Sequence, residues 1–142
     1  MSQKTRTSLS GTNWLLQRVT GVGLIVLLGF HFAVEHFIVG AANVTAENTA
    51  ERMATGVIDA SHIFDVTIDM PALLYQATAL LLLVFSVYHG MYGAYNVIVE
   101  WGVSPRTERA LQVGFALLSV ALLIQGVLIF LAFVGGGPRG GM

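Results

Sequence analysis

The sequence contains no cysteine, and this absence excludes several kinds of chemistry from the chain. Without a thiol the chain can form no disulfide, hold no thiolate-bound iron–sulfur cluster and use no cysteine nucleophile. It also cannot attach haem covalently in the c-type manner. Any iron–sulfur chemistry connected with this protein must therefore belong to a partner.

Charged residues are also scarce. They make up 11% of the 142 positions, against 55% hydrophobic residues, and the formal net charge is -1. Such a chain has no basic surface for nucleic acid, so we expect no nucleic-acid partner. The composition is typical of an integral membrane protein in contact with lipid rather than of a soluble domain.

Three apolar stretches are each long enough to cross the hydrocarbon core of a bilayer, which takes roughly 20 helical residues. We expect transmembrane helices at about residues 14–42, 71–100 and 109–134. Ionisable or amide side chains interrupt the first two stretches, whereas residues 110–134 carry no charge. The sequence therefore predicts an all-α membrane protein with one anchor domain over residues 1–142.

The positions of Lys and Arg predict how the helices are oriented in the membrane. The flanks of the first helix and the loop between the second and third helices hold most of them: Lys4, Arg6, Arg18, Arg106 and Arg109. The loop between the first two helices has only Arg52 among several acidic residues. We therefore expect a cytoplasmic N-terminus, with the first loop on the outer side.

The outer loop has helical periodicity of its own. In the run from Thr45 to Phe64, apolar residues at positions 53, 57, 60 and 64 fall on one helical face. We expect a short amphipathic helix here, within the outer loop.

The second apolar stretch places a histidine on one stripe of its helix with Gly93, Asn96 and Glu100, which follow His89 at i+4, i+7 and i+11. A glycine one turn from a histidine would let a flat iron porphyrin lie against the backbone, with the imidazole on the iron. The pattern is equally compatible with a structural role, in which His89 hydrogen-bonds to another helix and Gly93 makes a close helix–helix contact. The pattern alone leaves both interpretations open.

The first apolar stretch contains a second candidate ligand, His31. It lies 13 residues after Arg18, about 20 Å along a helix, whereas His89 lies 11 residues, about 16 Å, before Glu100. We therefore expect His31 nearer the outer face and His89 nearer the inner face, so that each needs a further ligand from another chain. His36 is the rival ligand on helix one, although we favour an interfacial polar role for it.

Two motifs resemble those of a known family. The run "WLLQRVTGVGLIVLLGFH" resembles the first-helix signature of the cytochrome b membrane anchor subunits of succinate:quinone oxidoreductases, in which Arg-Val-Ser/Thr-Gly precedes a distal-haem histidine by a fixed interval. The run "YHGMYGAYNVIVEWG" is similar to their second-helix signature of Tyr-His, a glycine four residues on and an acidic–aromatic pair. The resemblance is to anchors of the kind with two haems and two anchor chains.

The resemblance implies a role for each histidine. His31 corresponds to an axial ligand of the distal haem b and His89 to one of the proximal haem b, with Gly93 beside it. In such complexes each anchor chain donates one histidine to each haem, which agrees with the depths expected for the two residues. The implied cofactors are two haems b shared with a sister anchor subunit.

The resemblance also implies a quinone site near the cytoplasmic end. Arg18 matches a family arginine close to the quinone and to the proximal haem propionates. Glu100 and Trp101 match the acidic–aromatic pair, and Trp14 stands where some members carry a serine. The quinone is the implied substrate, and the chain itself has no catalytic nucleophile.

The implied complex is succinate dehydrogenase, or complex II, of the tricarboxylic acid cycle. Flavoprotein and iron–sulfur subunits would oxidise succinate, and the two anchors would pass the electrons to a quinone in the cell membrane of a prokaryote. Two alternatives stay open. One is the anchor of a quinol:fumarate reductase. The other is a non-redox membrane protein with a proton relay through His31, His89, Glu35 and Glu100.

Overall fold

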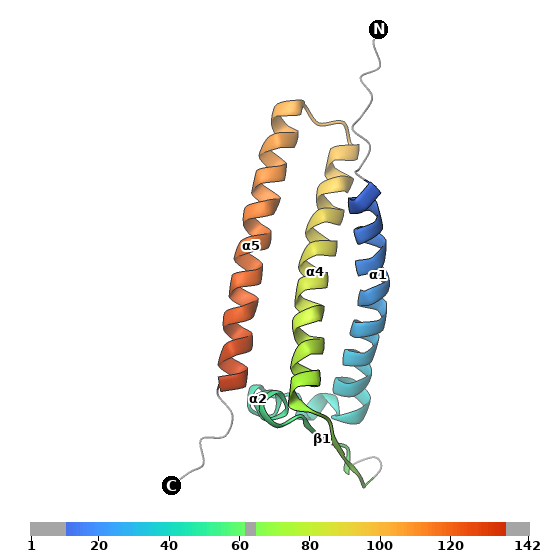
Figure 1. The fold of residues 1–142 in the computed structure, drawn as a ribbon, viewed down its shortest axis with the longest axis vertical. Helices are drawn as coiled ribbons and strands as arrows, with labels where there is room; N and C mark the ends of the chain where they lie inside the picture. The colour runs from blue at the N-terminus through green and yellow to red at the C-terminus, as the bar shows by residue number, and fades with distance from the viewer. Residues whose placement is uncertain (1–10, 62–64, 136–142) are drawn as a thin grey trace.

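The computed structural model describes residues 11–61 and 65–135. Three long helices, α1 (Gly11–Phe32), α4 (Ala72–Glu100) and α5 (Pro105–Gly135), run side by side with α4 between the other two (Figure 1). Each is long and apolar enough to cross a membrane, α1 together with the π-helical turn that follows it. The prediction of an all-α protein with three transmembrane helices is confirmed.

The α-helical geometry of α1 ends earlier than expected. From Ala33 to Ile38 the chain forms a π-helical turn, η1, in which the Val39 N–H donates to the Val34 carbonyl at 2.8 Å. A short 3-10 helix, η2 (Ala41–Asn43), follows a turn at Gly40. The expectation of one continuous helix as far as residue 42 was therefore wrong, because the wider π turn rotates the end of the helix relative to its shaft.

Helix α5 starts at Pro105, four residues before the expected start. Ser104 caps it, since its Oγ accepts a hydrogen bond from the Thr107 N–H at 3.2 Å. A proline in the first helical position suits this start, because that N–H has no helical partner to lose.

The outer-loop helix is shorter than the periodicity predicted. Helix α2 covers only Ala46–Thr55. The strand β1 (Val57–Asp59) begins two residues later and pairs antiparallel with β2 (Thr67–Asp69). The prediction of a helix from Thr45 to Phe64 was therefore wrong between Gly56 and Ala60, whereas Ser61 is helical and residues 62–64 lie outside the described residues.

Gly56 is the physical reason why α2 stops. Its φ of 77° is in the left-handed region, and its N–H donates to the Arg52 carbonyl at 2.8 Å, which closes the helix. A Cβ on Gly56 would also overlap the Met70 carbonyl oxygen, so the hairpin approaches too closely for any side chain here. Of the periodic apolar residues after this point, Val57 belongs to β1 and Ala60 follows it directly.

The fully buried apolar residues lie at the end of the bundle that carries α2, η1, η2, β1 and β2, which we call the cap. Ile58 of the hairpin packs there with Val34, Val39 and Tyr75. The three helices above the cap stand in a single row, so most of their apolar side chains are exposed. This surface is available to lipid and to other membrane chains.

Glycines allow close approach along both helix seams. A Cβ on Gly23 of α1 would overlap the ring of Phe85 on α4, and one on Gly126 of α5 would lie 2.6 Å from Leu83. Nearer the α4–α5 loop, Tyr95 meets Phe115 edge-on with ring centroids 6.2 Å apart. These contacts fix α4 against both neighbours.

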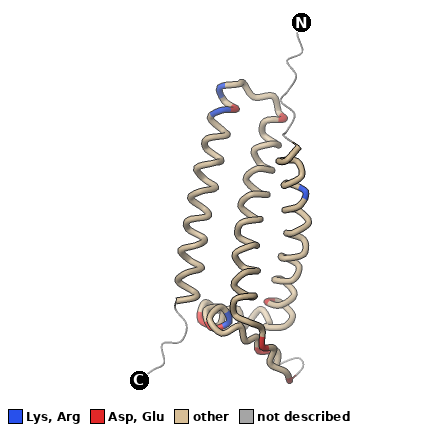
Figure 2. Tube along the Cα trace, in the orientation of Figure 1, with Lys and Arg blue, Asp and Glu red and all other residues tan. Residues whose placement is uncertain are grey.

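Most charged residues of the described ranges lie at the two ends of the row of helices (Figure 2). The cap carries most of the acidic residues, and the α4–α5 loop end carries Arg106 and Arg109. The stretches between contain few charges, as a bilayer core requires.

Candidate functional site

His89 of α4 lies against the first turns of α1. Its Nδ1 is 3.1 Å from the Gln17 carbonyl oxygen and 3.3 Å from Thr20 Oγ1. A carbonyl oxygen can only accept a hydrogen bond, so Nδ1 must carry the ring proton. In the neutral imidazole this leaves Nε2 with the lone pair that a metal ion needs.

The side chains of α1 around His89 are themselves held in place. Thr20 is buried, and its hydroxyl donates to the Leu16 carbonyl at 2.8 Å, which leaves its oxygen free to accept from His89. Gln17 Nε2 donates to the His89 backbone carbonyl at 3.2 Å. Sequence reasoning did not identify Gln17 or Thr20, although Thr20 belongs to the Arg-Val-Thr-Gly motif.

Gly93 lies one turn from His89 and also faces α1. A Cβ on it would be 3.1 Å from Gln17 Nε2, so the missing side chain makes room for the glutamine. Gly93 therefore makes the close helix–helix contact that was one of the two interpretations of its sequence pattern. Whether Gly93 also borders a porphyrin stays a prediction.

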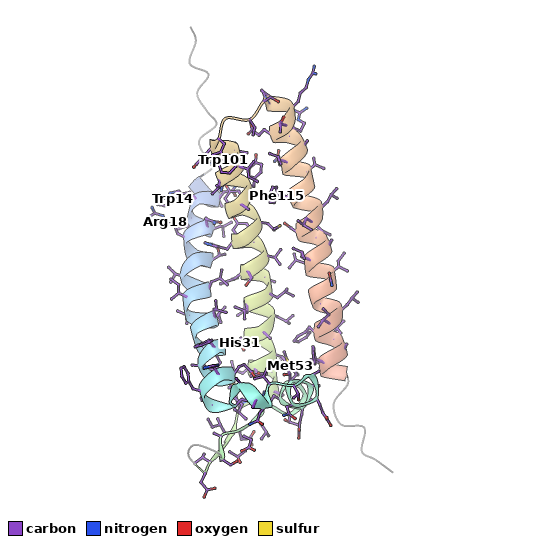
Figure 3. The ribbon with its side chains drawn as sticks, turned by 180° about the vertical axis from the view of Figure 1, so that it is seen from behind. Trp14, Arg18, His31, Met53, Trp101 and Phe115 are labelled. Carbon is purple, nitrogen blue, oxygen red and sulfur yellow. The ribbon has the colours of Figure 1, made fainter. Side chains whose placement is uncertain are left out.

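His31 lies toward the cap (Figure 3). Since His89 contacts Gly21, and His31 is 10 residues further along α1, the two imidazoles are separated by about 15 Å along the helix. His31 is exposed and has no hydrogen bond within residues 11–61 and 65–135. The two histidines are therefore too far apart to bind one iron, as their spacing predicted.

His36, the rival ligand, is exposed as well but is surrounded by phenylalanine rings. It stacks on Phe32 with centroids 4.9 Å apart and meets Phe37 edge-on at 5.1 Å. The adjacent Glu35 is buried. The π turn therefore directs neighbouring residues to opposite sides, Glu35 inward and His36 outward.

The donor set limits the kind of metal centre that this chain can form. Within the described ranges there is no group of three or more His, Cys, Asp or Glu side chains that could hold a metal ion. Separate single histidines fit an iron whose other ligands come from a porphyrin and another chain. The Nδ1–H bond of His89 to a carbonyl is the outer contact typical of a metal-ligating histidine, so the residues fit haem at this position.

The residues expected at the quinone site lie near the end of the bundle opposite the cap. Arg18 Cζ is 3.8 Å from the ring centroid of Trp14, a cation–π contact. Trp101 is 80% exposed, and Glu100 is also exposed. Figure 3 shows Trp14, Arg18 and Trp101 at this same end.

Among these four residues of the described ranges, only Arg18 and Trp14 are joined by a ring or polar contact. No hydrogen bond, ion pair or ring contact in the described part of the chain joins the Arg18–Trp14 pair to Glu100 or Trp101. A hollow of about 750 Å³ at the same end is lined instead by α5 residues that include Arg106, Arg109 and Leu117.

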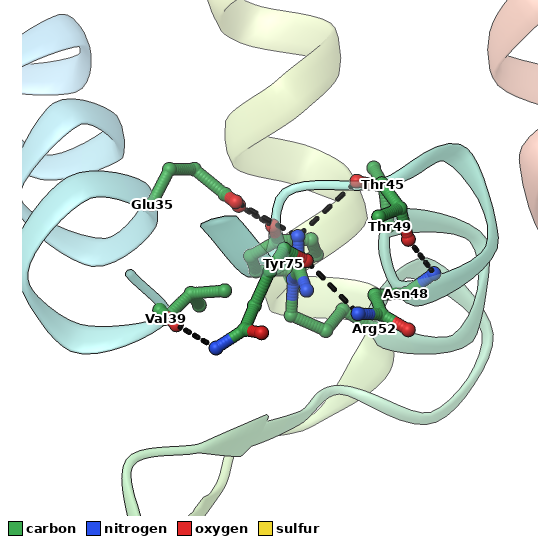
Figure 4. A network of polar contacts seen from close by, with 8 residues as sticks. Glu35, Val39, Thr45, Asn48, Thr49, Arg52 and Tyr75 are labelled. Atoms are coloured by element: carbon green, nitrogen blue, oxygen red, sulfur yellow. Dashed lines mark hydrogen bonds and ion pairs between the residues drawn. The ribbon is translucent and has the colours of Figure 1, made fainter. Parts of the chain in front are cut away.

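A buried polar cluster in the cap was not predicted as a unit. Arg52 Nη2 lies 2.8 Å from Glu35 Oε2, and the Tyr75 hydroxyl donates to Glu35 Oε1 at 2.5 Å (Figure 4). The three residues come from α2, η1 and α4. In the sequence, Glu35 stands out as an acid in an apolar stretch and Arg52 as an arginine in an acidic loop. Periodicity gives no reason to pair the two. Both carboxylate oxygens of Glu35 are engaged, so it is poorly placed to pass protons along a relay.

Comparison with known proteins assigns the family. The sequence model for the family described as "Succinate dehydrogenase/Fumarate reductase transmembrane subunit" matches residues 2–134, which cover α1, α4 and all of α5 except its last residue, Gly135. No curated protein and no solved structure gave a significant match. The matched range also contains His31, His89 and Arg18, the residues that carried the sequence resemblance. The chain belongs to the family of succinate dehydrogenase/fumarate reductase transmembrane subunits.

Proposed function

We propose that this chain is a haem b-binding anchor of a succinate:quinone oxidoreductase. In this role it takes electrons from flavoprotein and iron–sulfur partners and delivers them to a membrane quinone. Family membership supports the role of membrane subunit in such a complex. The observation that carries the haem-binding part is the contact of His89 Nδ1 with the Gln17 carbonyl, which leaves Nε2 as the ligand atom.

Each histidine would hold the iron of a different haem. His89 would hold the haem nearer the α4–α5 loop, and His31 the haem nearer the cap. When bound, haem b accepts and releases single electrons at a potential that its axial ligands and surroundings set. The chain's own contribution is to place the imidazoles and to keep their surroundings apolar.

A sister anchor subunit would hold each haem from the other side. The exposure of His31 supports this partner, because an ionisable side chain in a membrane segment is costly when it faces lipid and normally faces a partner or a cavity. The single row of helices also leaves the flanks of α1 and α4 uncovered. A second chain that packs on this side would complete both haem sites.

Arg18 and Trp14 form the part of the quinone site that belongs to α1. The guanidinium carries several N–H donors that can reach a quinone oxygen or a haem propionate. Its position over the Trp14 ring restrains the arginine while leaving the side chain exposed. Glu100 and Trp101 would border the same site from the end of α4.

The α4–α5 loop end faces the cytoplasm in this proposal, in a prokaryotic cell membrane. Arg18, Arg106 and Arg109 lie toward that end, whereas the one arginine described in the cap, Arg52, is neutralised by its buried pairing with Glu35. The positive charge that sets orientation is therefore concentrated at one end. The flavoprotein and iron–sulfur partners would bind there.

An absorption spectrum of the purified complex tests this function. Reduced-minus-oxidised bands of low-spin haem b, together with succinate-driven quinone reduction, are the expected result. A colourless complex without this activity would favour the proton-relay alternative. Fumarate reduction by quinol that is much faster than succinate oxidation by quinone would favour the fumarate reductase anchor.

A further inference from the structure

We propose that the α1 turn from Gln17 to Gly21 positions His89 and tunes the haem it ligates, with Thr20 and Gly21 as the positioning residues. This inference rests on the proposed function, and it assigns a role to residues that neither contact the iron nor belong to the quinone site. It also gives the Arg-Val-Thr-Gly motif a physical meaning. The motif precedes His31 in sequence, but its Thr and Gly contact the histidine of the other helix.

The first part of the argument is the hydrogen bonding of the imidazole. The Nδ1 proton of His89 has two acceptors, the Gln17 carbonyl at 3.1 Å and Thr20 Oγ1 at 3.3 Å. The Thr20 hydroxyl proton is already directed to the Leu16 carbonyl at 2.8 Å, which orients a lone pair toward His89. Two acceptors on one N–H raise the electron density of the imidazole and hence the basicity of Nε2. A more basic axial ligand stabilises ferric relative to ferrous iron.

The second part is the space around the ring. A Cβ on Gly21 would lie 3.0 Å from His89 Cε1 and 3.5 Å from Nδ1, closer than ordinary van der Waals contact to Cε1. Cε1 is bonded to both ring nitrogens, so pressure there shifts Nε2 as well. An alanine at Gly21 would therefore displace the ring from the Gln17 carbonyl and change the direction in which Nε2 points.

The test uses variants of the whole complex, with the midpoint potential of each haem and the electron paramagnetic resonance spectrum of the ferric haems as readouts. Thr20→Val keeps the side-chain shape but removes the hydroxyl acceptor. We expect it to shift the potential of the His89 haem upward and to leave the His31 haem unchanged. Thr20→Ser restores the hydroxyl and should return the potential toward that of the wild type.

Gly21→Ala should change the resonance of the His89 haem or reduce its occupancy, because the ring is displaced. Gly23→Ala is the matched control. It also introduces a clash between α1 and α4, but against Phe85 rather than His89. This control should loosen the helix pair while leaving the spectrum of the His89 haem as in the wild type.

Two results would overturn the inference. One is an unchanged potential of the His89 haem in Thr20→Val. The other is the same spectral change in Gly23→Ala as in Gly21→Ala, since the effect would then come from general helix packing. The proposed function fails in a different way, through a wild-type complex without haem b or a His89→Ala variant that keeps both haems.

Discussion

Glu35 and Arg52 lie 17 positions apart and form a buried ion pair 2.8 Å long that joins η1 to α2 within the cap. Tyr75 of α4 donates to the other carboxylate oxygen, so one acidic side chain connects three elements. The π turn makes this possible, because it directs Glu35 inward while His36 stays exposed. The cluster therefore holds η1 and α2 of the cap together and fixes both against α4.

Removal of the acid should weaken the cap strongly. Glu35→Leu leaves Arg52 buried without a counter-charge, which costs about 3–5 kcal/mol of unfolding free energy. The double variant Glu35→Leu, Arg52→Met removes both charges and should recover most of that loss. Unfolding in a denaturing detergent, followed by circular dichroism, gives the comparison. Equal stability of the single variant and the wild type would show that the pair contributes nothing.

Tyr75→Phe is a milder test of the same cluster. It removes a hydrogen bond to a charged group, which contributes about 1.5–3 kcal/mol. The same unfolding assay should place this variant between the wild type and Glu35→Leu. A loss as large as that of Glu35→Leu would mean that the ring, rather than the hydroxyl, is the important part.

Gly56→Ala should disturb the hairpin more than Gly102→Ala does. Both glycines have positive φ, 77° and 84°, so each substitution carries backbone strain of about 1–3 kcal/mol. Only at Gly56 would the new Cβ also meet the Met70 carbonyl, whereas nothing lies within 4 Å at Gly102. Hydrogen exchange of the β1 and β2 amides should therefore accelerate in Gly56→Ala alone. Similar exchange in both variants would contradict the steric part of the argument.

The choice between His31 and His36 can be made by haem content. His31→Ala should abolish the signal of the haem nearer the cap, because His31 is exposed without a partner in the described ranges. His36→Ala should largely keep that signal, because its ring is packed between Phe32 and Phe37. Spectra of the two variants in purified complexes give the answer. The reverse pattern would assign the ligand to His36.

Arg18→Lys should separate quinone reduction from succinate oxidation. Lysine keeps the positive charge, but it lacks the planar fork of donors and stacks less well on Trp14. We expect normal insertion and normal succinate oxidation with a soluble artificial acceptor, together with much slower quinone reduction. Equal loss of both activities would indicate failed assembly. Unchanged quinone reduction would leave Arg18 as a topological anchor only.

The sequence predicts the membrane helices well, because the length of an apolar stretch is set directly by the thickness of the bilayer. The different depths of His31 and His89 also follow from helix rise alone. The end of α1 and the hairpin of β1 and β2 cannot be predicted in this way. A π turn and the left-handed conformation of Gly56 depend on tertiary contacts with Arg52, Tyr75 and Met70 that no periodicity reveals.

The candidate site was only partly predictable for the same reason. His89 and Gly93 were identified from their spacing on one helix. Their partners Gln17 and Thr20 come from another helix more than 60 positions away, and the pairing depends on the register between α1 and α4. Thr20 in the Arg-Val-Thr-Gly motif was the one visible sign of this contact.

Haem content of the His89→Ala complex tests the central claim most directly. Helix α4 stays apolar enough to span the membrane without the histidine, so the variant should insert and assemble. The account predicts a complex that contains the chain in normal amount but has lost the haem nearer the α4–α5 loop, with the other haem retained. A variant that keeps both haems would contradict ligation by His89.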